Sequence, residues 1–98
     1  MIIYVDIDNT ITYTKSTNYG EAEPNFYRIS KINKLYKDGH YIVYWTARGV
    51  GSNIDYTILT TEQLKTWGCL YNELKLDKPV FDLFIDDKNQ NIDYLDKL

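Results

Sequence analysis

Residues 4 to 12 read YVDIDNTIT, which places two aspartates two positions apart at the end of a run that favours burial. Residues 1 to 7, MIIYVDI, are mostly β-branched and aromatic, which is typical of a strand buried on both faces in a parallel sheet. We predict that this strand ends at Asp8. Asp6 and Asp8 would then lie at the carboxyl end of a strand, where open α/β sheets bind their ligands.

The rest of the chain alternates helical and strand patterns. An amphipathic helix is predicted from Pro24 to Gly39, a strand at 40–46 (HYIVYWT), a helix at 54–67 ending at Gly68, a possible short strand at 69–74 (CLYNEL), a strand at 80–85 (VFDLFI), and a short helix at the end. Residues 12–23 suit a loop or a small hairpin. This order predicts right-handed βαβ crossovers in an α/β fold, a Rossmann-like three-layer α/β/α sandwich with a mainly parallel sheet.

Composition restricts the class of protein. At 98 residues the chain is most simply one domain, and its net charge of -3, with dispersed lysines, argues against nucleic acid as a partner. The single cysteine, Cys69, excludes an internal disulfide. There is no basic signal-peptide region and no apolar stretch near the ~20 residues of a membrane span. We therefore expect a cytoplasmic protein with no membrane partner.

Polar side chains gather at the predicted strand ends. They are Asp6, Asp8 and Thr10 after the first strand, Thr46 and Arg48 after the second, and Asp86 and Asp87 after the last, with Lys78 just before that strand. Four carboxylates in one crevice repel one another unless cations neutralise them. Oxygen ligands favour Mg²⁺, whereas the isolated His40 and Cys69 argue against zinc.

Four short motifs carry a resemblance. DIDNT at 6–10, Thr46 in WTARG, Lys78 in DKP, and FIDDKN at 84–89 are similar, in the same order, to the four motifs of the haloacid dehalogenase (HAD) superfamily of phosphohydrolases. The resemblance covers the chain from Asp6 to about Asn91. It implies a phosphatase that works through an aspartyl-phosphate intermediate.

The resemblance also implies catalytic roles. Asp6 would be the nucleophile, and Asp8 would protonate the leaving group and then activate water. Thr46, with nearby backbone N–H groups, would hold the phosphoryl group, and Lys78 would neutralise its charge and position Asp6.

Metal and substrate residues follow from the same resemblance. Asp6, the backbone carbonyl of Asp8, Asp86 and Asp87 would hold Mg²⁺, and either member of the last pair could be the direct ligand. Thr10 would fix the turn after the first strand, and Thr10, Ala47 and Arg48 would lie on the substrate side. For Arg48 taken alone, a surface ion pair is an equal alternative.

The chain leaves no room for a cap domain. Residues 1–98 would form a single HAD-like catalytic domain, with a flap at about residues 11–23 beside the nucleophile. Capless relatives resemble enzymes that act on large substrates or whose site a neighbouring subunit closes, so a homo-oligomer is possible.

The predicted function is Mg²⁺-dependent hydrolysis of a phosphomonoester. The substrate would be a small molecule or a polymer end, such as a sugar phosphate or a nucleotide in polysaccharide or nucleotide metabolism. The alternatives are a non-catalytic, regulatory protein that binds a phosphorylated ligand, and a phosphotransferase. A calcium loop fits poorly because Ile11 replaces its required glycine, and a dinucleotide loop fails at Ile54.

Overall fold

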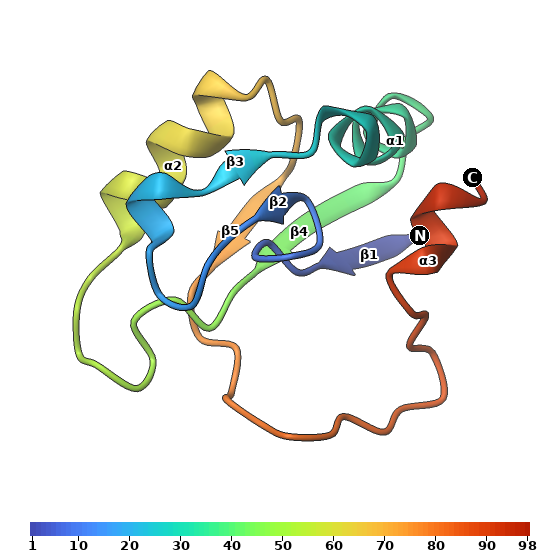
Figure 1. Ribbon diagram of the computed structural model, residues 1–98. Coiled ribbons are helices and arrows are strands. Elements are labelled where there is room, and N and C mark those ends of the chain that lie inside the picture. Colours follow the sequence, from blue (N-terminus) through green and yellow to red (C-terminus); the bar gives the residue numbers. More distant parts are fainter.

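A three-stranded parallel sheet forms the centre of the protein, and the computed structural model describes residues 1–98 (Figure 1). Its strands β1 (Ile2–Val5), β4 (Tyr41–Trp45) and β5 (Glu73–Lys75) lie in the order β1-β4-β5. Helix α1 (Phe26–Lys37) connects β1 to β4, and α2 (Thr57–Thr66) connects β4 to β5. Both crossovers step the same way across the sheet, so right-handed connections put both helices on one face.

The hydrophobic core lies between that face and the helices. It contains Val5, Ile7, Ile11, Ile29, Ile32, Ile42, Tyr44, Leu64, Cys69 and Leu95. The strand register puts Tyr4 and Tyr41 on the opposite face, where both are exposed. The α/β class and the parallel sheet are thus confirmed, but helices cover only one face, and a second helical layer is not seen.

Residues 12–23 are predicted to form a loop or a small hairpin, and the structure shows the hairpin. Strand β2 (Thr12–Tyr13) pairs antiparallel with β3 (Glu23–Pro24), and the short 3₁₀ helix η1 (Tyr19–Glu21) lies between them. Helix α1 begins after Asn25, whose Oδ1 accepts a hydrogen bond from the Arg28 backbone N–H at 3.1 Å. Pro24 therefore ends the hairpin and does not open the helix.

The C-terminal helix α3 (Asp93–Asp96) packs beside α1 and close to the N-terminus (Figure 1). Leu95 enters the core, and the Arg28 guanidinium donates to both carboxylate oxygens of Asp96 at 3.0 and 3.1 Å. These contacts fix the end of the chain on the body. None of the helices combines the length and the apolar character needed to cross a bilayer.

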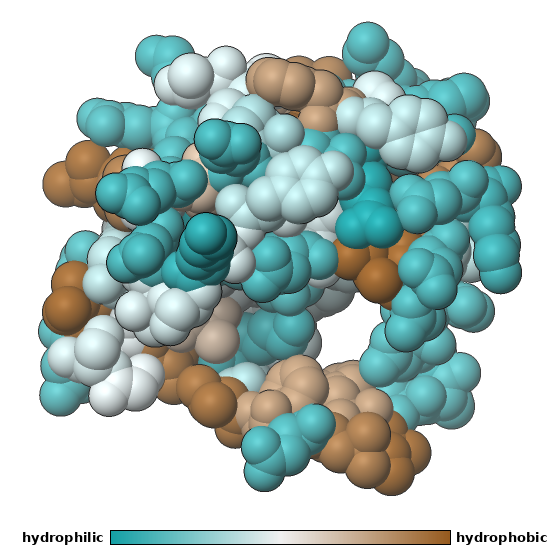
Figure 2. Space-filling view, viewed as in Figure 1, coloured by the Kyte–Doolittle hydropathy of each residue, from teal (hydrophilic) through white to brown (hydrophobic).

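The predicted strand at 80–85 is wrong. Residues 79–90, which we name the arm, form a segment without helix or strand between Lys78 and α3, with bends at residues 82, 87 and 88, and it makes no hydrogen bond to the rest of the chain. Figure 2 shows an opening between the arm and the body, with the apolar arm residues along its rim. A hydrophobic run becomes a strand only when it pairs with a neighbour, and within one chain the arm has none.

Candidate active site

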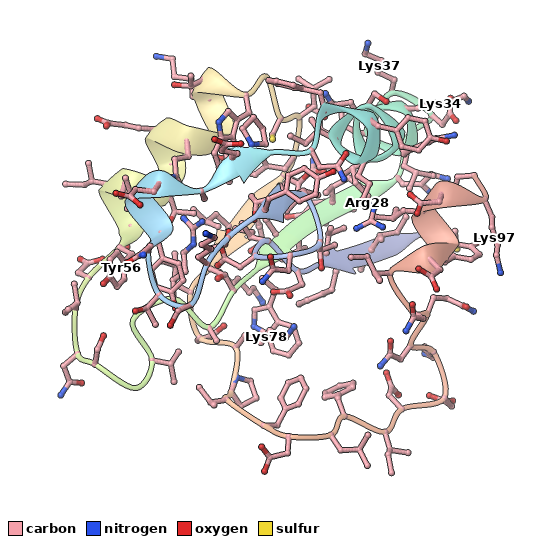
Figure 3. The ribbon with its side chains drawn as sticks, viewed as in Figure 1. Arg28, Lys34, Lys37, Tyr56, Lys78 and Lys97 are labelled. Carbon is pink, nitrogen blue, oxygen red and sulfur yellow. The ribbon has the colours of Figure 1, made fainter.

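Asp6 and Lys78 meet at the carboxyl ends of β1 and β4. The Lys78 Nζ lies 3.4 Å from the Asp6 Oδ1, and the Lys78 backbone N–H donates to the Thr46 carbonyl at 3.2 Å. An open pocket of about 210 Å³ borders this pair, lined by Asp6, Ala47, Lys78, Pro79, Val80 and Phe81. Figure 3 places Lys78 at the edge of the opening beside the arm. The structure thus confirms the predicted proximity of the two residues.

The environment of Asp6 affects its ionisation. Its side chain is 37% exposed, and its partial burial raises the pKa of the Asp6 carboxyl above the usual 3.8, while the nearby Lys78 ammonium lowers that pKa. The aromatic rings of Trp45 and Phe81, 5.7 and 5.5 Å from the Lys78 Nζ, hold the ammonium group in place. The pocket therefore has one carboxylate and one cation, both accessible to a ligand.

Asp8 points away from this pocket and binds Arg48. The Arg48 Nε and Nη2 donate to the two Asp8 carboxylate oxygens at 2.9 and 2.8 Å, which is a bidentate ion pair. The Thr14 hydroxyl also donates to Asp8 Oδ1 at 2.8 Å. The chain leaves the strand at Asp6 and turns at residues 8–10, so the two aspartates do not share a face.

Arg48 is neither a substrate contact nor a surface ion pair. Its side chain is fully buried, and its Nη1 donates to Thr60 and Gln63 of α2 at 3.1 and 2.6 Å. The prediction that Arg48 binds substrate is wrong in this arrangement, because no part of the guanidinium reaches solvent. Arg48 instead joins the turn after β1 to α2.

The same cluster holds the hairpin down. The Tyr19 ring lies 4.9 Å from the Arg48 guanidinium and packs edge-on against Tyr56, while the Gln63 side-chain N–H donates to the Tyr19 carbonyl at 2.7 Å. The predicted flap is therefore attached to α2 through η1. A second hollow of about 600 Å³ lies over the hairpin between Asn9 and Glu23.

Residues that the sequence patterns did not reveal fix the turn after β1. Asn9 adopts a left-handed φ of +60°, and its Oδ1 accepts from the Thr14 backbone N–H at 3.0 Å. The Thr12 hydroxyl accepts from the Asn9 backbone N–H at 3.2 Å and lies 2.6 Å from that of Thr14. Thr10, for which the resemblance does imply a part in this turn, contributes its backbone N–H, which donates to the Ile7 carbonyl at 3.1 Å. Spaced threonines give no sequence signal, because these bonds depend on the turn itself.

Thr46, Ala47 and Gly49 follow β4. The Thr46 hydroxyl is buried and accepts a hydrogen bond from the Arg48 backbone N–H at 3.2 Å, while Ala47 lines the pocket. Gly49 has a φ of +84°, and a Cβ there would lie 2.1 Å from the Ile54 carbonyl oxygen. This loop thus requires glycine at position 49.

Asp86 and Asp87 do not reach the site. Both lie exposed on the arm, and neither forms an ion pair. No group of three metal-binding side chains exists in the chain. The predicted Mg²⁺ ligands are therefore not assembled within one chain, because the strand that would carry the last two does not join the sheet.

Comparison with known proteins establishes a similarity of fold only. No protein-family model matches the chain, and no curated protein does. A crystal structure of a protein from Vibrio cholerae matches with a TM-score of 0.89 and 24% sequence identity, over 100% of this chain and 89% of that one. The alignment runs from end to end of this chain, the arm included. The protein therefore shares its α/β fold with this solved structure.

Proposed function

We propose that this protein hydrolyses a phosphomonoester with Asp6 as the nucleophile, as a capless relative of the HAD superfamily and its Rossmann-like fold. The observation that carries the proposal is the pairing of Asp6 and Lys78 at 3.4 Å beside an open pocket at the strand ends. A phosphate in this pocket would have a carboxylate nucleophile and a neutralising ammonium group within reach at the same time.

Each step breaks one bond to phosphorus and forms another. The Asp6 carboxylate oxygen attacks phosphorus, the bond from phosphorus to the leaving oxygen breaks, and the leaving oxygen takes up a proton from solvent. Water then cleaves the aspartyl-phosphate, which releases inorganic phosphate and restores the carboxylate. Lys78 would stabilise the phosphoryl oxygens in both steps, since positioning and charge neutralisation dominate phosphoryl transfer.

The contacts of Asp8 restrict the proton transfer that the resemblance implies for it. Both of its carboxylate oxygens accept hydrogen bonds from Arg48, and one also accepts from Thr14. Donating a proton to a leaving group requires Asp8 to rotate away from the guanidinium. In the conformation observed, Asp8 positions the turn that follows Asp6.

The resemblance implies four ligands for Mg²⁺, and the structure brings only some of them together. One chain supplies Asp6 and the Asp8 carbonyl, whereas its Asp86 and Asp87 lie elsewhere, so the residues of a single chain do not fit the ion. We assign no step to the metal on this basis. The substrate class, a sugar phosphate, a nucleotide or a phosphorylated polymer end, follows from the resemblance and from the open pocket.

The incomplete set of acids also favours a second candidate function, in which the chain binds a phosphorylated ligand without cleaving it. Measuring phosphate release from a panel of phosphoesters, with Mg²⁺ present, separates the two. We expect Asp6→Asn to lower the rate by a factor of about 10³ or more, as loss of a nucleophile does in other enzymes. Asp38→Asn, at an exposed residue paired only with Lys34, should retain the wild-type rate. Equal rates for Asp6→Asn and wild type would refute the hydrolase, and tight binding without turnover would support the second candidate.

A further inference from the structure

We propose that two copies of this chain exchange their arms, so that each arm pairs with the outer edge of β1 in the partner and carries Asp86 and Asp87 to the partner's Asp6. The exchange rests on the geometry of the arm and of the sheet edge. Its consequence for metal binding rests in addition on the proposed function.

The arm is unsuited to solvent. Val80, Leu83 and Ile85 are 74%, 74% and 87% exposed. Phe81 and Phe84 are also exposed; their rings pack on each other, 5.3 Å apart, and the Lys78 ammonium lies 5.5 Å from the Phe81 ring. The backbone of residues 79–90 makes no hydrogen bond within the chain. Exposed apolar side chains together with unpaired backbone groups are characteristic of a segment that pairs as a strand with another chain.

The outer edge of β1 is the matching surface. β1 and β5 are the two edge strands of the sheet, and β5 carries the charged residues Glu73 and Lys75. β1 is the uncharged run Ile2–Val5, with Ile2 70% exposed. Natural sheets protect free edges with charged side chains, so the uncharged edge of β1 is the one that another strand would complete. The opening in Figure 2 lies between the arm and the body.

The chain's own arm cannot bring its acids to this edge. A strand parallel to β1 with Asp86 level with Asp6 would start beside Met1, about 16 Å from Asp6 at roughly 3.3 Å per residue. The backbone of Lys78 is bound to Thr46 at the opposite, carboxyl end of the sheet. The three residues from Lys78 to Phe81, which would lie beside Met1, span at most about 11 Å. With Lys78 beside Asp6, an intramolecular parallel strand is therefore excluded.

A second copy removes this restriction. The arm runs from Lys78 at the carboxyl end of β1 back towards α3 near the N-terminus, so it is antiparallel to its own β1 (Figure 1). The opening in Figure 2 separates the arm from the body. A two-fold axis between the arms would make the partner's arm antiparallel to this arm and parallel to this β1. The strands would follow in the order β1, partner's arm, arm, partner's β1. Each arm would then gain hydrogen-bonding neighbours on both sides, in a symmetric interface.

The same arrangement completes the acidic cluster. The partner's Asp86 and the partner's Asp87 would follow a strand that ends at the carboxyl end of β1, next to Asp6. Three carboxylates beside a single ammonium group, that of Lys78, form an oxygen site suited to a divalent cation such as Mg²⁺. A site that one chain lacks would thus exist twice in the dimer.

The mass in solution tests the exchange without reference to activity. Light scattering after gel filtration should give twice the 11.6 kDa of one chain. Leu83→Asp should give a monomer, because the charge would lie within the new sheet. Ile58→Asp is the matched control, since Ile58 on α2 is 76% exposed, against 74% for Leu83, and should leave the dimer intact. A wild-type monomer, or a Leu83→Asp dimer, would overturn the proposal.

Mixed dimers test which chain supplies the acids. Chains with two different tags, one carrying Asp6→Asn and the other Asp86→Asn with Asp87→Asn, are co-expressed, and the mixed dimer is purified through both tags. One of its two sites would then be intact, so we expect it to bind one Mn²⁺ by electron paramagnetic resonance and to show about half of the wild-type phosphate release. Both homodimers should lack this Mn²⁺ site and this activity.

The outcomes separate the two proposals. A mixed dimer with neither Mn²⁺ binding nor activity, beside a wild-type dimer that has both, would show that each chain supplies its own acids and would overturn the exchange. A wild-type dimer that binds Mn²⁺ but releases no phosphate would refute the hydrolase and leave the Mn²⁺ readout to decide the exchange. A wild-type dimer without Mn²⁺ binding would overturn the completed acidic cluster.

Discussion

At the scale of single residues, Arg48 is the reason why Asp6 and Asp8 have different partners. Its guanidinium binds the Asp8 carboxylate in a bidentate pair and reaches Thr60 and Gln63 on α2. Asp6, two positions earlier, pairs instead with Lys78. One D-x-D motif therefore supplies two carboxylates with different surroundings: Asp6, the proposed nucleophile, faces a pocket, and Asp8 faces the interior.

We expect Arg48→Lys to lower the free energy of unfolding by about 3 kcal/mol, because it leaves a partly buried carboxylate without its bidentate partner. Arg28→Lys is the matched control: Arg28 forms the same bidentate pair with Asp96, but the Asp96 side chain is 43% exposed. Its cost should stay below about 1 kcal/mol. Urea denaturation measures both, and equal losses would argue against a structural role for the buried pair.

The raised pKa of Asp6 predicts a pH effect with a definite sign. Below the usual pKa of 3.8 the carboxyl is protonated in both the folded and the unfolded state. As pH rises through the higher folded pKa, the unfolded state loses its proton first, so the contribution of Asp6 to stability is lost. Lys78→Met should raise the pKa of Asp6 further, because the nearby ammonium charge lowers it. Carbon NMR titration of the Asp6 carboxyl measures this, and an unchanged or lower pKa in the variant would contradict it.

At the scale of elements, the loop between β4 and α2 delivers Arg48 to the interior. Gly49 makes this possible, because its positive φ and the close Ile54 carbonyl exclude a side chain. The hairpin β2–β3 is then attached to the same region through Tyr19 and Gln63. The site is thus organised from α2 as well as from the strand ends.

We expect Gly49→Ala to destabilise the fold by about 2 kcal/mol or more, since a left-handed conformation alone costs a non-glycine residue of order 1–3 kcal/mol. Gly51→Ala is the control, because a Cβ at Gly51 meets no atom within 4 Å. Thermal unfolding followed by circular dichroism compares the two. A similar melting temperature for both variants would show that the loop relaxes around the new methyl group.

At the scale of the whole molecule, the protein is a small folding unit. Its core covers one face of a three-stranded sheet, and its apolar arm makes no hydrogen bond to the rest of the chain. If the arms are exchanged, folding and assembly are coupled. The free energy of unfolding should then rise by about 1.4 kcal/mol for each tenfold increase in protein concentration. Urea midpoints at several concentrations measure this, with Leu83→Asp as the variant expected to show no dependence. A concentration-independent midpoint for the wild type would contradict coupled assembly.

Local pattern was enough to predict several features of this protein. The buried runs that became β1 and β4, the helical periods of α1 and α2, and the pairing of Asp6 with Lys78 follow from β-branched and apolar spacing and from the rule that ligands bind at strand ends. Each of these depends on residues close in sequence, or on the common edge of a parallel sheet. Sequence therefore determined strands β1 and β4, helices α1 and α2, and the main polar pair.

Tertiary structure alone decided the rest. Arg48 and Asp8 are 40 positions apart, and only the folded loop shows that they bind each other rather than a substrate. The run at 80–85 has the composition of a strand, yet the short tether from Lys78 keeps it from its own β1. Composition states what a segment would bury, but chain connectivity and distance decide which surface it can reach.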